Sequence, residues 1–312
     1  MEQKNGQESN SRGRPTFAVS STLFDEKAVA PVSTRTVWTL RILNTLASVA
    51  VFVVNGLGSS GFIAGRSQGD VSGRYPNPIT PAGYAFSIWG LIYFFHAAFL
   101  VYQWLPTVNK GLVFGRVAYW NIALCAGNIT WIFVFSYELL EVSAAVIWYM
   151  LVCLATIYFR IHTHKGLSAL DVKNRRTWLE YFCVYVPWSL YTCWLVGASL
   201  VNTFLATRQR PEDLVYGGIG ALTSAAFIVV LVLCWTRDVW FAGVNVWTLV
   251  AIGLRQETYV AIWSVSFSLA GLVGAFAVLI WGINVYDLFA KQDEDENETT
   301  AANQGNFIRS VV

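Results

Sequence analysis

Long runs of apolar residues, separated by short polar links, fill the middle of the chain. A helix needs about 20 mostly apolar residues to cross the hydrocarbon layer of a bilayer, and eight runs come close to that length. They lack the strict alternation of a membrane β-strand, so helices are expected. We predict spans near residues 36–57, 81–105, 116–137, 142–160, 178–205, 216–236, 239–255 and 259–284. The seventh run is short and a tight Arg237–Asp238 link precedes it, which leaves seven crossings as the alternative.

The composition supports a membrane protein. Hydrophobic residues make up 55% of the chain and charged residues only 13%, against roughly 25% charged in soluble domains. Residues 1–35 hold nine of the charged residues and residues 287–312 hold eight, so the long middle has too few to cover a soluble surface. This excludes a cytosolic enzyme, and a net charge of +2 provides no basic field for nucleic acid. The predicted fold class is an all-α integral membrane bundle of about eight helices.

The two ends of the chain differ from the middle. Residues 1–35 are polar and lack the apolar core of a signal peptide, and residues 287–312 contain the acidic run DEDENE, so we predict two disordered tails. The last three residues, Ser310 to Val312, fit a PDZ groove as a weak partner hypothesis.

Fifteen Lys and Arg residues on one side of the predicted topology against five on the other place both termini in the cytosol. Small-residue faces such as Gly271-x-x-Gly274 allow a homodimer without requiring one.

Ionisable side chains are almost absent from the predicted spans. Arg41 and Glu180 lie near span ends, and no Asp or Glu sits at mid-depth. This disfavours proton-coupled transport and voltage sensing. His96 is the one central titratable side chain apart from cysteines, which we interpret as packing residues. It is either an axial haem ligand or a neutral imidazole packed between helices, and the lack of a second histidine in a span favours the latter.

Three predicted spans carry aromatic and amide side chains at helical spacing on one face. These faces comprise Trp89, Tyr93 and His96 in the second span, Asn128, Trp131 and Phe135 in the third, and Pro187, Tyr191, Trp194, Ala198 and Asn202 in the fifth. Amide and indole groups that faced lipid would lack hydrogen-bond partners, so the faces should turn inward. Pro187 is expected to bend its helix and open space beside it. The faces then either line an apolar pocket or pack against one another as core.

The stretch ITPAGYAFSIWGLIY, residues 79–93, resembles the start of the second helix in the TspO family of tryptophan-rich sensory proteins, also called translocator proteins or peripheral benzodiazepine receptors. The family pattern is approximately P-x-G-W-x-F-x-P-x-W-x-x-x-Y. It is matched by Pro81, Gly83, Phe86, Trp89 and Tyr93, while Tyr84 replaces a tryptophan and Ile88 a proline. The third-helix motif N-x-x-W is matched by Asn128 and Trp131, with Phe135 after them. The fifth-helix motif of the family is P-Y-x-x-W followed by A-x-x-L-N. Pro187, Ala198 and Asn202 match it, while Trp188 replaces the tyrosine, Tyr191 the tryptophan and Val201 the leucine.

The resemblance covers about residues 36–205 and implies a five-helix unit, followed by a three-helix extension at 206–286. It implies a pocket for flat apolar ligands, such as tetrapyrroles (haem included) or sterol-like molecules, with no required cofactor and a sensor or regulator role. The residues expected near the ligand are Pro81, Gly83, Tyr84, Phe86, Trp89, Tyr93, His96, Asn128, Trp131, Phe135, Pro187, Tyr191, Trp194 and Asn202. From their charge, we expect Arg66 and Arg74, in the loop before the second span, to meet ligand carboxylates such as porphyrin propionates.

Two other functions are weighed against ligand sensing. A facilitative carrier or permease for a small amphipathic solute would suit eight helices, but the motifs of the first five spans do not recur in the last three, as an internal repeat would require. A membrane enzyme that degrades bound porphyrin is the third alternative. The sequence shows no nucleophile–base pair or metal-ligand cluster to support it.

Overall fold

The computed structural model describes residues 32–162 and 175–311, in which all regular structure is helical. The main helices are α1 (Thr34–Ser59), α2 (Gln68–Arg74), α3 (Ile88–Tyr102), α4 (Trp120–Ser136), α5 (Leu140–Ile161), α6 (Arg175–Glu180), α7 (Val186–Thr207), α8 (Val215–Thr236), α9 (Val239–Arg255) and α10 (Val260–Val311). Each of the eight predicted apolar runs lies on one of the long helices. The all-α fold class is therefore confirmed.

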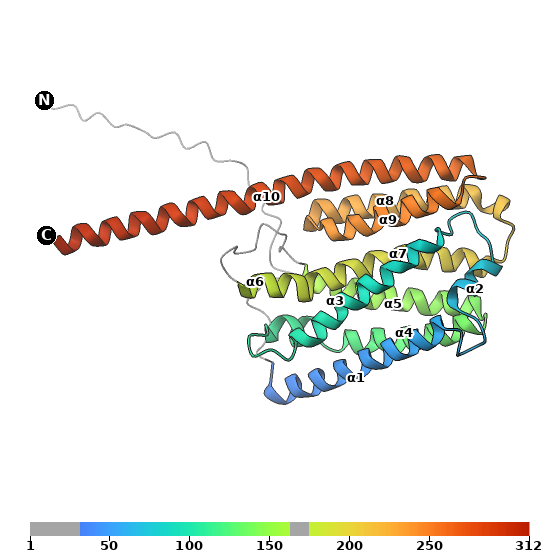
Figure 1. The fold of residues 1–312 in the computed structure, drawn as a ribbon, viewed down its shortest axis with the longest axis horizontal. Helices are drawn as coiled ribbons and strands as arrows, with labels where there is room; N and C mark the ends of the chain where they lie inside the picture. The colour runs from blue at the N-terminus through green and yellow to red at the C-terminus, as the bar shows by residue number, and fades with distance from the viewer. Residues whose placement is uncertain (1–31, 163–174, 312) are drawn as a thin grey trace, which may run out of the picture.

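The long helices lie side by side in a layered bundle (Figure 1). α1 packs on α4, α4 on α5, α5 on α7 and α7 on α9, while α8 and α9 pack on α10. The first turn of α1 and the point where α10 leaves the bundle lie at the same end, which we call the terminal end (Figure 1). The short helix α2 lies at the opposite end, which we call the α2 end.

The chain is a multi-pass integral membrane protein. Six helices of the described residues are long and apolar enough to cross a bilayer. A seventh span is formed if the helical turn Gly111–Val117 and α4 count together, although a 56° bend separates them. α9 has 17 residues and is shorter than the usual spanning length. A total of eight therefore requires that both the bent pair and α9, the run already predicted to be short, cross the bilayer.

Two irregular turns shape the ends of the central helices. The bend before α4 occurs at Ala118, which has a φ of 47°, a left-handed conformation that residues with a Cβ rarely adopt. A widened, π-type turn at Tyr181–Tyr185 precedes α7 and leaves Pro187 in the first turn of that helix. The helical backbone runs without a break from this turn into α7, and the wider turn accommodates Pro187, which has no N–H to donate to a preceding carbonyl. The irregularity at this point is therefore the turn before the proline rather than a kink within α7.

The C-terminal segment differs from its prediction. The helical backbone of α10 continues through Val311 and leaves the bundle, where the sequence had predicted a disordered tail from residue 287 (Figure 1). The segment contains Ala, Glu and Gln residues, which favour helices, and the prediction from acidity alone did not weigh them. Of the predicted N-terminal tail, only the last residues are described, and Ser33 caps α1 by accepting from the N–H of Thr36 at 3.1 Å.

Buried amides fasten α1 to α4 within the bilayer region. Asn121 Nδ2 donates to Asn44 Oδ1 at 3.2 Å, and Asn55 Nδ2 donates to Asn128 Oδ1 at 2.6 Å. Hydrogen bonds between membrane helices contribute roughly 0.6–2 kcal/mol each. Asn128 therefore faces inward as predicted, but its shorter hydrogen bond is to Asn55 on α1.

Candidate ligand-binding site

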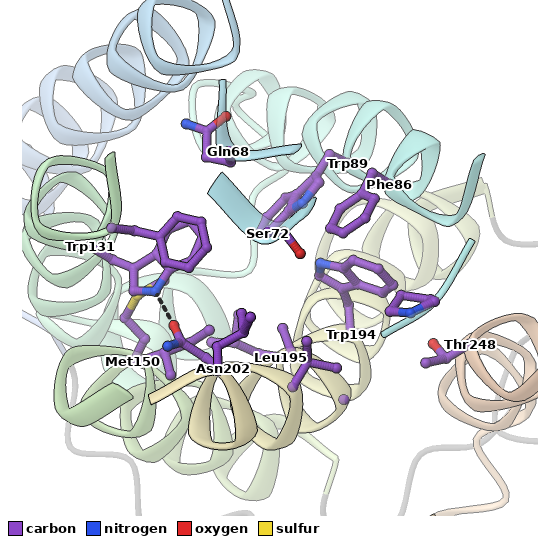
Figure 2. A pocket seen from close by; sticks show the side chains of 17 residues that line it. Gln68, Ser72, Phe86, Trp89, Trp131, Met150, Trp194, Leu195, Asn202 and Thr248 are labelled. Atoms are coloured by element: carbon purple, nitrogen blue, oxygen red, sulfur yellow. Dashed lines mark hydrogen bonds between the residues drawn. The ribbon is translucent and has the colours of Figure 1, made fainter. Parts of the chain in front are cut away.

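An apolar cavity of about 60 Å³ lies near the α2 end (Figure 2). Its aromatic walls come from three helices and the turn before α3: Phe86 and Trp89, Trp131 and Phe135, and Trp194. Pro81, Gln68, Ser72, Asn202 and Thr248 also line it, among mostly aliphatic neighbours. The structure therefore brings together Pro81, Phe86, Trp89, Trp131, Phe135, Trp194 and Asn202 from the predicted set.

The rings hold one another in fixed orientations around this cavity. Trp131 stacks on Phe135 with ring centroids 4.7 Å apart and planes 19° from parallel. On the other side, Trp194 meets Phe86 and Trp89 edge to face, at 5.9 and 6.1 Å. Stacked and edge-to-face pairs are the favoured arrangements of aromatic quadrupoles. The cavity wall is thus a set of mutually supported ring surfaces.

The indole N–H groups of Trp131 and Trp194, which face each other across the cavity, differ in their hydrogen bonding. Trp131 Nε1 donates to Asn202 Oδ1 at 2.8 Å, and the amide of Asn202 donates to Ser143 Oγ at 2.9 Å (Figure 2). Trp194 Nε1 is buried and has no hydrogen-bond partner among the described residues, and the same holds for Gln68 Nε2. A buried donor without a partner costs roughly 1–3 kcal/mol. A ligand with a hydrogen-bond acceptor would remove that cost.

Three predicted residues form a layer behind Trp89 instead of lining the cavity. Tyr93 stacks on Trp89 with centroids 5.4 Å apart, and Tyr191 meets the same indole edge to face at 5.7 Å. Asn128 Nδ2 donates to the Tyr191 hydroxyl at 2.9 Å. These residues therefore support the wall of the cavity without being part of its surface.

His96 is packed in the interior and does not line the cavity. Its Nε2 lies 3.1 Å from Ser48 Oγ on α1. Three aromatic rings enclose the imidazole. The ring centroids of Trp188, Phe99 and Phe52 lie 5.3, 5.8 and 6.0 Å from that of His96, and those of Phe99 and Trp188 lie 5.2 Å apart. The geometry fits the packed imidazole and gives the haem-ligand alternative no support, because Nε2 already has a partner and the ring is enclosed.

The remaining predicted residues also lie away from the cavity surface. Pro187 is on α7 seven residues before Trp194, where the cavity lining on that helix begins, which places it about 10 Å away along the helix axis. Gly83 begins a short 3₁₀ turn, Gly83–Ser87, before α3. Tyr84 is half-exposed and meets Trp247 edge to face at 5.1 Å. Some motif residues thus line the cavity, while the others lie on the surrounding helices and turns without reaching its surface.

The extension holds the segment that enters α3. Gln256 Nε2 donates to the carbonyls of Asn77 and Thr80 at 3.1 and 2.9 Å. The backbone N–H of Ala82 donates to the carbonyl of Ala251 on α9 at 2.9 Å. Pro81 and Phe86, which line the cavity, belong to the segment that these bonds fix.

Sequence reasoning missed this role of α9. Trp247 Nε1 donates to the carbonyl of Ala85 at 3.1 Å, and Thr248 lines the cavity itself. The sequence assigned α9 to a separate extension because the recognisable motifs end near residue 205. Asn245, Trp247 and Thr248 within this apolar run, and Gln256 at its end, were the available signals of inward contacts.

The predicted loop arginines bind a carboxylate of the chain itself. Arg66 and Arg74 each donate to Glu138 Oε1, at 2.5 and 3.0 Å, and Tyr75 donates to Glu138 Oε2 at 2.7 Å. The Tyr75 hydrogen bond and the two guanidinium groups hold the pKa of Glu138 below its usual value. Neither arginine lines the cavity; together they tie α2, one of its walls, to the α4–α5 turn.

A comparison with models of protein families shows the family to which the chain belongs. A family model described as TSPO-like protein matches residues 41–281. The chain belongs to the TSPO-like protein family. The match continues beyond the recognisable motifs through α8, α9 and the part of α10 within the bundle, so the helices that hold the α3 entry are included in it. No curated protein and no solved structure matches the chain.

This TSPO-like chain also has a polar cluster at the terminal end that the sequence did not reveal. Ser189 Oγ and Asp238 Oδ2 lie 2.9 and 3.4 Å from His162 Nε2, and Tyr158 donates to Asp238 Oδ2 at 2.9 Å. In a catalytic triad the acid binds the imidazole nitrogen opposite the serine. Here both groups meet the same nitrogen, and Nδ1 faces the carbonyl of Tyr158 at 3.2 Å. The cluster therefore joins α5, α7 and the α8–α9 link without the geometry of a hydrolase.

Burial is the main influence on the histidine of this cluster. His162 is 3% exposed, and its burial lowers the pKa of the imidazole, while the nearby Asp238 carboxylate opposes the change. The neutral imidazole is thus the stable form in the folded protein. Residues 162 and 238 lie far apart in the sequence on different apolar runs, which is why no motif indicated their contact.

Proposed function

We propose that this protein binds a flat, mainly apolar ligand with a hydrogen-bond acceptor, of the tetrapyrrole or sterol-like class, and acts as a membrane sensor or regulator rather than an enzyme. The observation that carries the proposal is the cavity enclosed by Trp89, Trp131 and Trp194 from three different helices. Ring surfaces complement a flat ligand, and the free N–H of Trp194 offers it one directional contact.

The cavity has to open before such a ligand enters. Its volume of about 60 Å³ is well below the roughly 300–1,000 Å³ typical of pockets for drug-sized molecules. The long helices α3, α4, α5, α7 and α9 contribute most of its lining, but one wall is α2, which has only seven residues. Ion pairs to Glu138 hold α2 in place. We infer that displacement of α2 admits the ligand.

Quenching of tryptophan fluorescence by protoporphyrin, with purified protein in detergent, tests the proposal. Trp194→Phe keeps the aromatic wall and removes the N–H, so we expect the Kd to rise about fivefold, the effect of one neutral hydrogen bond. Trp263→Phe is the matched control because it removes one indole from the exposed face of α10. Equal affinities in both variants and the wild type would exclude the cavity as the site.

The same preparation distinguishes a binder from the two other functions. A binder returns the porphyrin chemically unchanged after incubation in the dark, as judged by its absorption spectrum after extraction. An enzyme would convert it, and a carrier would move it into sealed vesicles down its gradient. Conversion or uptake that is lost in Trp194→Phe would replace the sensor proposal.

A further inference from the structure

A second cavity, of about 300 Å³, lies at the terminal end between the start of α1 and the end of α3. Its lining includes Arg41, Lys110, Trp38 and Trp104. None of the proposed functions uses this cavity, and it shares no lining residue with the aromatic cavity at the α2 end.

Aromatic rings hold the guanidinium of Arg41 at this cavity. Its central carbon lies 5.0 Å from the ring centroid of Trp38, 5.2 Å from that of Trp104 and 5.4 Å from that of Phe114. Trp104 is fixed in turn, because its Nε1 donates to Thr45 Oγ1 at 3.1 Å. Cation–π contacts orient the guanidinium without using its N–H groups. The Nε of Arg41 is buried and has no hydrogen-bond partner among the described residues.

The lining of this cavity carries positive charge and no carboxylate. Arg41 and Lys110 contribute two cations, and no Asp or Glu lines the cavity. The first turn of α1 contains no acidic residue either, so the positive end of the helix dipole adds to the field. Other arginines of the described residues do form ion pairs with carboxylates: Arg66, Arg74, Arg208, Arg210 and Arg237. The cavity is thus prepared for an anion that the described chain does not supply.

The position of the cavity matches the depth of lipid head groups. Arg41 lies seven residues after the start of α1, or about 10 Å along the helix, and Trp38 and Trp104 are half-exposed, as is common for tryptophans at a membrane interface. Below them, Ile42 and Leu46 present exposed apolar side chains on α1. An acyl chain can lie along this face while its phosphate reaches the cavity.

We propose that this cavity binds the phosphate-bearing head group of an anionic phospholipid, with Arg41 and Lys110 as its contacts. Basic pockets between membrane helices bind anionic head groups in this way. A zwitterionic phospholipid is disfavoured because its ammonium group would lie near the same two cations. The aromatic faces beside Arg41 and the apolar face of α1 favour a lipid over a free anion, which would use the charges alone.

Native mass spectrometry of the full chain in detergent tests the proposal. Phosphatidylglycerol and phosphatidylcholine with the same acyl chains are titrated separately, and we expect retained adducts at lower concentration with phosphatidylglycerol. Arg41→Gln and Lys110→Gln should each weaken phosphatidylglycerol binding about fivefold, the effect of one basic residue near an anionic lipid. Lys110 is exposed, so its variant should fold normally.

Arg35→Gln is the matched control, because Arg35 is an exposed cation on the first turns of α1 that does not line the cavity. It should leave lipid binding unchanged. Equal binding of the two lipids, or equal losses in Arg35→Gln and Arg41→Gln, would overturn the proposal in favour of a general surface charge. Displacement of the lipid by millimolar inorganic phosphate would overturn it in favour of a site for a small free anion.

Discussion

The aromatic cavity at the α2 end and the Asp238 cluster at the terminal end treat their buried polar groups in opposite ways. At the α2 end, Trp194 Nε1 and Gln68 Nε2 face an aromatic cavity without a partner. At the terminal end, the hydroxyls of Tyr158 and Ser189, both nitrogens of His162 and both carboxylate oxygens of Asp238 all have partners. An unpaired buried donor costs roughly 1–3 kcal/mol, and at the cavity a ligand with a hydrogen-bond acceptor would remove that cost. The difference supports the proposed ligand binding at the aromatic cavity and fits a role of the Asp238 cluster in helix association.

The largest expected effect comes from Asp238→Ala. The carboxylate binds Tyr158 and accepts from the N–H groups of Trp240 and Phe241 at the start of α9. Loss of a buried charged partner and of a helix cap should lower the free energy of unfolding by about 3 kcal/mol or more. Chemical unfolding in detergent measures the change.

Asp287→Ala is the control for this variant, because Asp287 pairs with Arg237 at the same end but is partly exposed. It should cost less than about 1 kcal/mol. Protoporphyrin affinity of the folded fraction should be unchanged in both variants. A stable Asp238→Ala protein with weakened ligand binding would reverse the assignment of the two ends.

The sequence alone predicted where the helices lie, but it did not predict which residues of different helices contact one another. Apolar runs near spanning length have to form helices in a bilayer, where backbone groups find no water, so all eight predicted runs are helical. The inward direction of Trp89, Trp131 and Trp194 followed from their indole groups and their spacing. The continuation of α10 beyond residue 287 did not follow, since acidity and helix propensity favour opposite outcomes there.

Contacts between distant helices explain what the sequence missed at the site. The bonds from Gln256 to Asn77 and Thr80 join residues about 180 positions apart, and no local pattern encodes such a pairing. The same holds for His162 and Asp238. Conversely, Asn128 and Pro187 satisfy the motif pattern, but Asn128 bonds α4 to α1 and α7, and Pro187 follows the widened turn at the start of α7. A motif position therefore did not by itself identify a cavity residue.

Gln256→Ala should have the next largest effect, and it tests whether the extension supports the site. Two carbonyls of the α3 entry lose their donor, so we expect the free energy of unfolding to fall by about 2 kcal/mol. Protoporphyrin affinity should also fall, because Pro81 and Phe86 belong to the released segment. Gln209→Ala, an exposed glutamine after α7, should change neither quantity. Normal ligand affinity in a destabilised Gln256→Ala protein would show that α9 supports the fold alone.

A smaller effect is expected from acidification at the Asp238 cluster. Because burial lowers the pKa of His162 from its ordinary value of 6.5, the unfolded chain binds a proton at a higher pH than the folded protein does. The stability that depends on the neutral imidazole is therefore present above that ordinary value and is lost as the pH falls below it. The wild type should lose more stability than His162→Gln between about pH 7 and about pH 5. Parallel unfolding curves for the two proteins over this range would contradict the prediction.

The smallest effect on stability, and the sharpest test of ligand entry, is expected from Glu138→Gln. The neutral amide keeps the shape of the side chain but weakens its pairs with Arg66 and Arg74, which are partly exposed, so the free energy of unfolding should change by less than about 1 kcal/mol. If α2 has to move before a ligand enters, stopped-flow quenching should show faster association of protoporphyrin than in the wild type. Glu141→Gln loses an exposed ion pair with Arg208 in which neither residue belongs to α2, and its association rate should not change. Equal acceleration in both variants would mean that surface charge, rather than the hold on α2, governs entry.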